Sequence, residues 1–122
     1  MKGIRRKKGE EWLLIAGFKG YMISSYGRVY SIKRKKVLKP FLVNRYLCVK
    51  LFNNGKSKKY RIHRLVAQAF LSNESNKPIV HHKDKNTKNN KAENLMWVTS
   101  DEHLQIHKIE RAKEATNEQK DN

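Results

Sequence analysis

The 122-residue sequence has one cysteine, Cys48, and only two prolines. A single cysteine excludes both a disulfide framework and a cysteine-based zinc site, so any metal site must use His, Asn, Asp or Glu side chains. Cys48 lies in the apolar stretch YLCVKLF with no histidine nearby in sequence. This setting predicts a buried strand residue rather than a catalytic thiol.

Long hydrophobic runs and acidic residues are also scarce. The longest runs, WLLIAGF and LVAQAFL, are far shorter than the ~20 apolar residues that cross a bilayer, and the basic N-terminus has no apolar stretch of a secretory signal. We therefore expect an intracellular protein without a membrane partner. The 28 Lys and Arg exceed the 11 Asp and Glu, for a formal net charge of +17. This charge, spread along the chain, predicts a polyanionic partner, and nucleic acid fits best.

Short aromatic and β-branched runs separated by Gly and Pro predict a small antiparallel sheet in the N-terminal half. A hairpin turn is expected at Asn54-Gly55, and the periodicity of HRLVAQAF predicts a helix that packs on the sheet. The aromatic residues expected in the core are Trp12, Phe18, Phe70 and Trp97. The strands are expected at Tyr21–Ile23, Arg28–Ile32, VLKPFLV, RYLCVKLF and Lys59–Arg61.

The C-terminal half is predicted to form a strand, a long polar loop, a second strand and a helix. The strand, loop and strand are expected at Ile79–His82, Lys83–Glu93 and Leu95–Val98. Thr99 and Glu102 have the spacing of a capping box, which predicts that the last helix begins there. Residues 112–122 are poor in apolar side chains and are expected to fray.

Four of the five histidines fall in this C-terminal half. His103 and His107 are four residues apart on the predicted helix, so their side chains lie on one face and can share an ion. His81 and His82 are adjacent on the predicted strand and point to opposite faces, so one can bind metal while the other faces a substrate. His63 lies outside this group, and a structural or DNA-facing role is expected for it.

The segment VHHKDKNTKNNKAENLMWVTSDEHLQIH, residues 80–107, resembles the active site of the HNH endonucleases, a ββα unit around one divalent ion. The resemblance implies that His82 is the general base and that Asn94 ties the long loop to the hairpin and so holds His82 in place. This sequence has His103 where many similar members of the family have Asn. The metal ligands that the resemblance implies are His81, His103 and His107.

The segment EEWLLIAGFKGYMISSYGRVYSI resembles the N-terminal modular motif, of the NUMOD type, that precedes HNH domains in phage and intron-encoded homing endonucleases. The resemblance implies an α+β protein: a small antiparallel sheet region followed by a ββα-metal (His-Me finger) nuclease motif. It also implies a phage-encoded protein in the cytoplasm of a bacterial host. We expect a basic leader at 1–9, a DNA-contacting region at 10–58, the HNH domain at 59–111 and a polar tail at 112–122.

Side-chain chemistry narrows the ion and the DNA contacts. Imidazole ligands favour Mn²⁺, Ni²⁺ or Zn²⁺, whereas Mg²⁺ prefers oxygen, so a histidine-rich site argues against strict dependence on Mg²⁺ but does not select one ion. The loop residues expected to contact phosphates are Lys83, Lys85, Lys88 and Lys91. The N-terminal residues expected to lie along DNA, with a solvated turn as the alternative, are Arg28, Lys33, Arg34 and Lys35.

The predicted function is a metal-dependent endonuclease that hydrolyses phosphodiester bonds in double-stranded DNA. The alternative is a non-catalytic nucleic-acid-binding module in which zinc on the three ligand histidines holds the fold together; a ribosome-associated protein leaves the histidines unexplained. His82 favours the enzyme, because a structural zinc site has no use for a second histidine beside its first ligand. The sequence leaves open the target, nicking or double-strand cleavage, and the need for a homodimer or a phage packaging partner.

Overall fold

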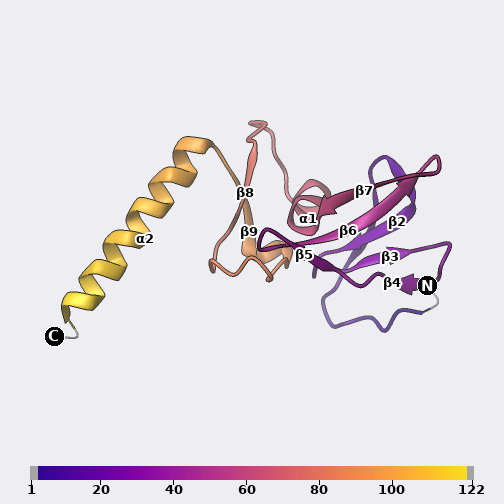
Figure 1. Cartoon of the computed structure of the whole chain (residues 1–122), viewed down its shortest axis with the longest axis horizontal. Helices are drawn as coiled ribbons and strands as arrows, with labels where there is room; N and C mark the ends of the chain where they lie inside the picture. The colour runs from indigo at the N-terminus through magenta and orange to yellow at the C-terminus, as the bar shows by residue number, and fades with distance from the viewer. Residues whose placement is uncertain (1–2, 121–122) are drawn as a thin grey trace.

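The computed structural model describes residues 3–120, and the side chains of residues 3–113. The expected leader and tail extend beyond these limits, at residues 1–2 and 121–122. The chain first forms an antiparallel sheet whose strands lie in sequence order, β1 (Trp12–Ile15), β2 (Phe18–Ser24), β3 (Val29–Ser31) and β4 (Lys36–Val37). The N-terminal antiparallel region that the sequence predicts is therefore present (Figure 1).

The structure divides this region into two sheets, which corrects the expectation of one. Pro40 has no backbone N–H, and the strand expected across VLKPFLV is broken around it into β4 and β5. The second sheet is also antiparallel and comprises β5 (Phe41–Val43), β6 (Tyr46–Asn53) and β7 (Lys56–Arg61). The predicted turn at Asn54-Gly55 is confirmed, with φ values of +53° and +77° as a two-residue hairpin loop requires.

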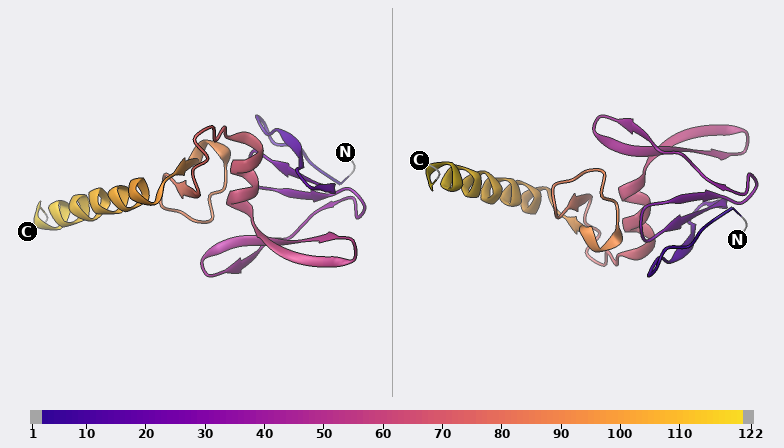
Figure 2. Two further views of the ribbon diagram at one scale, coloured as in Figure 1. Left: turned by 90° about the horizontal axis from the view of Figure 1, so that it is seen from above. Right: turned by 90° about the horizontal axis from the view of Figure 1, so that it is seen from below.

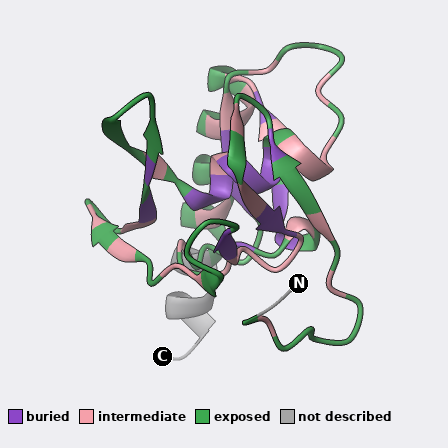
Figure 3. Cartoon of the chain, turned by 90° about the vertical axis from the view of Figure 1, so that its right-hand side faces the viewer, coloured by how far each residue is buried: buried purple, intermediate pink, exposed green. Residues whose placement is uncertain are grey.

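Helix α1 (Ile62–Phe70) joins the two sheets into one body. It contacts strands of both sheets and also the later strands β8 and β9, and Figure 2 shows it between these parts. Most of the buried apolar residues form one cluster around it, which comprises Ile15, Ile23, Val29, Val49, Leu51, Ile62, Leu65, Val66, Ala67, Val80 and Leu95. Burying a side chain of this size stabilises the fold by about 1.5–3 kcal/mol relative to exposing it, so this shared core holds the two halves together (Figure 3).

The predicted aromatic core residues lie at the edge of this cluster. Phe18, Phe70 and Trp97 are half-buried and pack against it. Trp12 is also half-buried and meets Tyr30 edge to face, with ring centroids 6.4 Å apart. These rings therefore extend the core rather than lie in its centre.

The C-terminal half has the order predicted for it: β8 (Ile79–His82), a polar loop, the single turn η1 (Ala92–Asn94), β9 (Leu95–Val98) and α2 (Ser100–Lys120). The capping box is confirmed, since the Thr99 N–H donates to Glu102 Oε1 at 3.0 Å and the Glu102 N–H donates to Thr99 Oγ1 at 3.1 Å. Helix α2 then extends away from the rest of the molecule (Figure 1).

Helix α2 continues to Lys120, and the fraying expected for the tail from residue 112 stays a prediction. Ala, Lys, Glu and Gln are strong helix formers, and their propensity sustains a helix where apolar packing is lacking. No helix between residues 3 and 120 combines the length and apolar character needed to cross a membrane.

Candidate active site

Strand β8 directs its two histidines to different neighbours. His81 is buried and faces α2, with its ring centroid 5.6 Å from that of His103 and 6.5 Å from that of His107. The two helix histidines are one turn apart, with ring centroids 4.4 Å apart and Nε2 atoms 3.2 Å apart. The structure therefore brings the three predicted metal ligands together.

The spacing of the helix pair suits a shared ion. Two nitrogens that each lie 2.0–2.1 Å from a tetrahedral ion are about 3.3 Å from one another, close to the 3.2 Å between His103 Nε2 and His107 Nε2. Among the described residues, however, no three His, Cys, Asp or Glu side chains are close enough to enclose an ion as they stand. The three histidines would have to come closer together to complete a three-histidine site.

The electrostatic surroundings keep His81 suited to metal. Burial lowers its pKa; Glu110 opposes this effect, and His103 and His107 add to it, so the net shift is downward. A metal ligand must be a neutral imidazole, and this shift favours that form. Glu110 Oε2 lies 3.8 Å from His107 Nδ1, where a carboxylate can orient the ring of a ligand histidine.

On the other side of β8, His82 is enclosed by protein. It is only 5% exposed, and its Nε2 lies 2.9 Å from Asn90 Oδ1. Its ring lies over those of His63 and Tyr46, with centroid distances of 5.0 Å and 6.3 Å. His82 is therefore fixed on both its edge and its face.

His63 is a buried neutral base beside His82. It is 4% exposed, at the start of α1, and its Nδ1 has no hydrogen-bond partner among the described residues. Burial, and then repulsion from His82, Arg61 and Arg64, lowers the pKa of His63 to about 3. His63 therefore supports the ring of His82 without bringing a charge to it at neutral pH.

Asn94 closes the long loop at its base. Its Nδ2 donates to Asp84 Oδ1 at 2.9 Å and to the Asn89 carbonyl at 2.8 Å, while its Oδ1 accepts from the Asp84 N–H at 3.1 Å. These bonds tie the loop to the hairpin, and the effect of Asn94 on His82 stays a prediction. The side chain that is hydrogen-bonded to His82 is that of Asn90.

A pocket of about 460 Å³ contains four of the histidines and has a basic rim. The cations that line it are Arg45, Lys85 and Arg111. Arg45 belongs to the turn between β5 and β6, and its carbonyl accepts a hydrogen bond from Thr87 Oγ1 at 2.6 Å. The second sheet therefore contributes to the site, which sequence reasoning missed because no motif joins that turn to the histidines.

The basic residues predicted to contact DNA occupy different settings. Lys83 and Lys88 are exposed on the long loop, whereas Lys91 lies over the ring of Tyr26 with 5.0 Å between Nζ and the ring centroid. Lys85 Nζ lies 3.7 Å from Glu110 Oε2. The other predicted residues, exposed in the β3–β4 turn at the end of the molecule opposite α2 (Figure 1), are Lys33, Arg34 and Lys35.

Arg28 has a place inside the N-terminal fold. Its guanidinium forms an ion pair with Glu10, in which Nε donates to Oε2 at 2.8 Å, and lies over the ring of Trp12 at 5.2 Å. Burial alone raises the pKa of Glu10, but hydrogen bonds, first of all from Arg28, lower it to about 2. Since the Glu10 side chain is fully buried, Arg28 cannot turn toward DNA without leaving a buried carboxylate unpaired. This pair argues against the DNA contact expected for Arg28.

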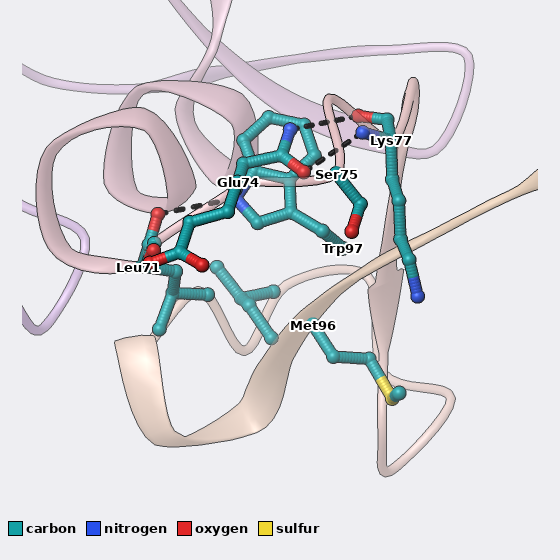
Figure 4. A pocket seen from close by; sticks show the side chains of 9 residues that line it. Leu71, Glu74, Ser75, Lys77, Met96 and Trp97 are labelled. Atoms are coloured by element: carbon teal, nitrogen blue, oxygen red, sulfur yellow. Dashed lines mark hydrogen bonds between the residues drawn. The ribbon is translucent and has the colours of Figure 1, made fainter.

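A second hollow, of about 500 Å³, lies between the loop after α1 and strand β9 (Figure 4). The Trp97 indole donates to the Leu71 carbonyl at 3.3 Å, and the Asn73 side chain bonds both backbone groups of Lys77 at 2.8 and 2.9 Å. These bonds fix the loop, and the hollow is lined by Leu, Ser, Asn, Glu, Lys, Met and Trp side chains. None of these lining residues is a histidine, so the pocket that contains four histidines is the candidate active site.

A ββα unit with histidines on its first strand and on its helix is the architecture of HNH endonucleases, and comparison with known proteins agrees. Residues 60–105 match the HNH endonuclease family and residues 10–52 match the NUMOD4 motif. The chain belongs to the HNH endonuclease family. The family and the fold class predicted from the sequence are therefore confirmed.

Two of the proteins to which this chain is similar are endonucleases of phages. The chain is 44% identical over 91 residues to DNA endonuclease I-HmuI of Bacillus phage SP01, covering 73% of this chain and 52% of the relative. It is 35% identical over 107 residues to H-N-H endonuclease F-TflII of Escherichia phage T5, covering 85% and 55%. A solved structure on DNA binding and cleavage by the HNH homing endonuclease I-HmuI matches with a TM-score of 0.76 and 40% identity, over 84% of this chain and 59% of that one. The chain thus spans about half the length of these relatives.

Proposed function

We propose that this chain is an HNH endonuclease that hydrolyses phosphodiester bonds in double-stranded DNA. The observation that carries this proposal is the placement of His82, held at Nε2 by Asn90 and lining the same pocket as the histidine cluster. The names of the relatives, which are a DNA endonuclease and an H-N-H endonuclease, support the same activity.

The hydrogen bond to Asn90 decides which nitrogen of His82 acts as the base. With Oδ1 of Asn90 as the acceptor, Nε2 of His82 carries the proton, so the lone pair is on Nδ1. Nδ1 then takes a proton from the attacking water, a role that is typically worth about 10²–10⁴-fold in rate. The ring contacts with His63 and Tyr46 hold that lone pair in one direction.

The neighbouring groups suit the remaining parts of the reaction. HNH endonucleases use a divalent ion, and His81, His103 and His107 are the residues that would hold it here; when bound, such an ion stabilises negative charge on the phosphate and the leaving oxygen. We propose Mn²⁺, Ni²⁺ or Zn²⁺ in preference to Mg²⁺, because the ligands are nitrogens. Arg45 and Arg111, which line the pocket, would bind the phosphate backbone.

Plasmid cleavage tests the proposal. Supercoiled plasmid is incubated with the protein and Mn²⁺, Ni²⁺, Zn²⁺ or Mg²⁺, with and without chelator, and the products are separated on a gel. His82→Ala is expected to abolish cleavage, whereas Gln105→Ala, exposed on the opposite face of α2, is expected to cleave like the wild type. Open circles indicate nicking, and linear DNA indicates cleavage of both strands, as a homodimer or a partner protein would allow.

Two results overturn the proposal. Cleavage that survives His82→Ala excludes His82 as the base. A wild-type protein that cleaves with none of the ions and unfolds when chelator is added is instead the basic module with a structural zinc. Because the named relatives are phage proteins, we further propose that the enzyme acts in the cytoplasm of an infected bacterial cell.

A further inference from the structure

Asn90 is unusually buried for its position. It belongs to the polar loop between β8 and η1, where Lys88 and Lys91 are exposed, yet Asn90 is only 5% exposed. Asparagine in a charged loop usually faces water, so its burial requires a partner that covers it. One partner is His82, through the bond of 2.9 Å at Nε2.

The other partner is the turn between β2 and β3 in the N-terminal region. Gly27 has a φ of +86°, and a Cβ built on it lies 2.9 Å from Asn90 Cβ and 3.2 Å from Asn90 O. A separation below 3.0 Å is closer than real Cβ atoms approach, so the backbone of the turn rests directly on Asn90. Only glycine allows both this φ and this close approach.

Two further contacts join the same segments. The Ala92 N–H donates to the Ser25 carbonyl at 2.8 Å. Lys91 Nζ lies 5.0 Å from the centroid of the Tyr26 ring. The contact between the loop and the N-terminal turn therefore extends along the chain on both sides and does not depend on one side chain.

We propose that Asn90 is a positioning residue for His82, and that the β2–β3 turn holds Asn90 in place through Gly27. The inference rests on the proposed function, because it takes His82 as the base. Asn90 lies behind His82 and outside the pocket lining, so it acts through His82 and not on the DNA. The β2–β3 turn of the N-terminal region then supports His82 indirectly, through its contact with Asn90.

The hydrogen bond to Asn90 fixes the direction of the His82 lone pair. The side-chain oxygen of Asn90, Oδ1, selects the tautomer of His82 that leaves the lone pair on Nδ1. The same hydrogen bond stops rotation of the His82 ring. A catalytic group must be held within about 0.5 Å of its productive position, and a hydrogen bond fails beyond about 3.5 Å. A displacement of Asn90 by less than an ångström is therefore enough to lose the control of His82.

Steady-state cleavage kinetics of the metal-loaded full chain test the role of Asn90. Asn90→Ala is expected to lower kcat by roughly 10–100-fold, a large part of the value of a general base, with KM for DNA nearly unchanged. Asn90→Asp keeps an oxygen acceptor for Nε2–H and is expected to recover most of kcat. A residue that only stabilised the loop would gain nothing from Asp, which places a charge in a buried position.

Gly27→Ala and Gly17→Ala form a matched pair for the role of the turn. Both glycines lie in turns of the same sheet with similar φ values, +86° and +84°, but a Cβ at Gly17 meets nothing within 4 Å. Both variants therefore carry the same backbone strain, and only Gly27→Ala pushes on Asn90. Gly27→Ala is expected to lower kcat about as much as Asn90→Ala does, whereas Gly17→Ala is expected to leave kcat unchanged. The double variant Gly27→Ala/Asn90→Ala is expected to be no slower than Asn90→Ala alone, because both changes act on the same contact.

Several results overturn the inference. Wild-type kcat in Asn90→Ala excludes the positioning role, and equal kcat in Gly27→Ala and Gly17→Ala excludes the role of the turn. Circular dichroism shows whether Gly27→Ala folds. If it does not, Tyr26→Leu takes its place, because it removes the ring below Lys91 and is expected to lower kcat several-fold. Unchanged kcat in Tyr26→Leu also overturns the role of the turn.

The same experiments separate this inference from the proposed function. Cleavage that survives His82→Ala means that the proposed base is wrong. Loss of cleavage in His82→Ala with wild-type kcat in Asn90→Ala means that the base is right and the positioning role is wrong. Nitrogen chemical shifts of the His82 ring at neutral pH give a readout independent of activity, since Asn90→Ala should lose the preference for a proton on Nε2.

Discussion

Acid should destabilise this fold through His63, the buried base beside His82. The unfolded chain binds a proton at this residue below pH 6.5, whereas the pKa of about 3 keeps His63 neutral in the folded chain at the same pH. Between these two values the unfolded state binds the additional proton, so the free energy of unfolding falls as the pH falls. The slope is about 1.4 kcal/mol per pH unit, which amounts to about 2 kcal/mol at pH 5 relative to pH 7.5.

Urea denaturation of the wild type and of His63→Phe at pH 7.5 and pH 5.0 measures this effect. Phenylalanine keeps a ring between Tyr46 and His82 but cannot bind a proton. The wild type is expected to lose about 2 kcal/mol more than the variant between the two pH values. Every other titrating group is common to both proteins, so the difference between the two losses reports His63 together with its interactions with His82, Arg61 and Arg64. An equal loss in the two proteins refutes the claim that His63 is buried and neutral.

Other contacts give equally direct expectations. Glu10→Gln should lower the free energy of unfolding, measured in urea, by about 2 kcal/mol, because Arg28 loses a charged partner. The variant should also lack the loss of stability that the wild type shows as the pH falls from about 4.5 to about 2. Unchanged stability of the variant at neutral pH contradicts this expectation. Thr99→Ala should cost about 1 kcal/mol by opening the capping box with Glu102, and an unchanged urea midpoint excludes that contribution. His103→Ala should weaken Mn²⁺ or Zn²⁺ binding in calorimetry by at least about tenfold, whereas wild-type affinity would mean that the helix pair is not the metal site.

The parts of the fold that the sequence predicted well rest on local signals. Strands β8 and β9 have the bounds expected from their short apolar runs, and the Thr99–Glu102 box and the Asn54-Gly55 turn depend on residues that are near neighbours. The grouping of His81 with the helix histidines was also accessible, because helical spacing and the family resemblance both pointed to it. Interactions between residues close in sequence were thus enough to predict the β8–β9 hairpin, the helix cap and most of the histidine cluster.

The parts that were missed depend on tertiary contacts. The turn at Asn44-Arg45 has positive φ at both residues, but no glycine follows Asn44, so its turn signal is weak, although the turn brings Arg45 to the pocket. The pairing of Arg28 with Glu10 spans 18 residues, and a basic residue in a basic chain looks like a DNA contact until its partner is known. Asn90 is one of several asparagines in its loop, and only the packing against Gly27 distinguishes it.

The shared core also limits which N-terminal motifs could be combined with this nuclease domain. The two family matches meet between residues 52 and 60, inside the β6–β7 hairpin, where Val49 and Leu51 of the first match pack in one cluster with Val66 of the second. A nuclease domain can therefore accept a new N-terminal motif only if that motif brings a surface shaped for α1 and a turn shaped for the loop that contacts His82. After recombination at this boundary, only pairs of an N-terminal motif and a nuclease domain that fit one another would fold. Each motif and its domain are therefore expected to be inherited together.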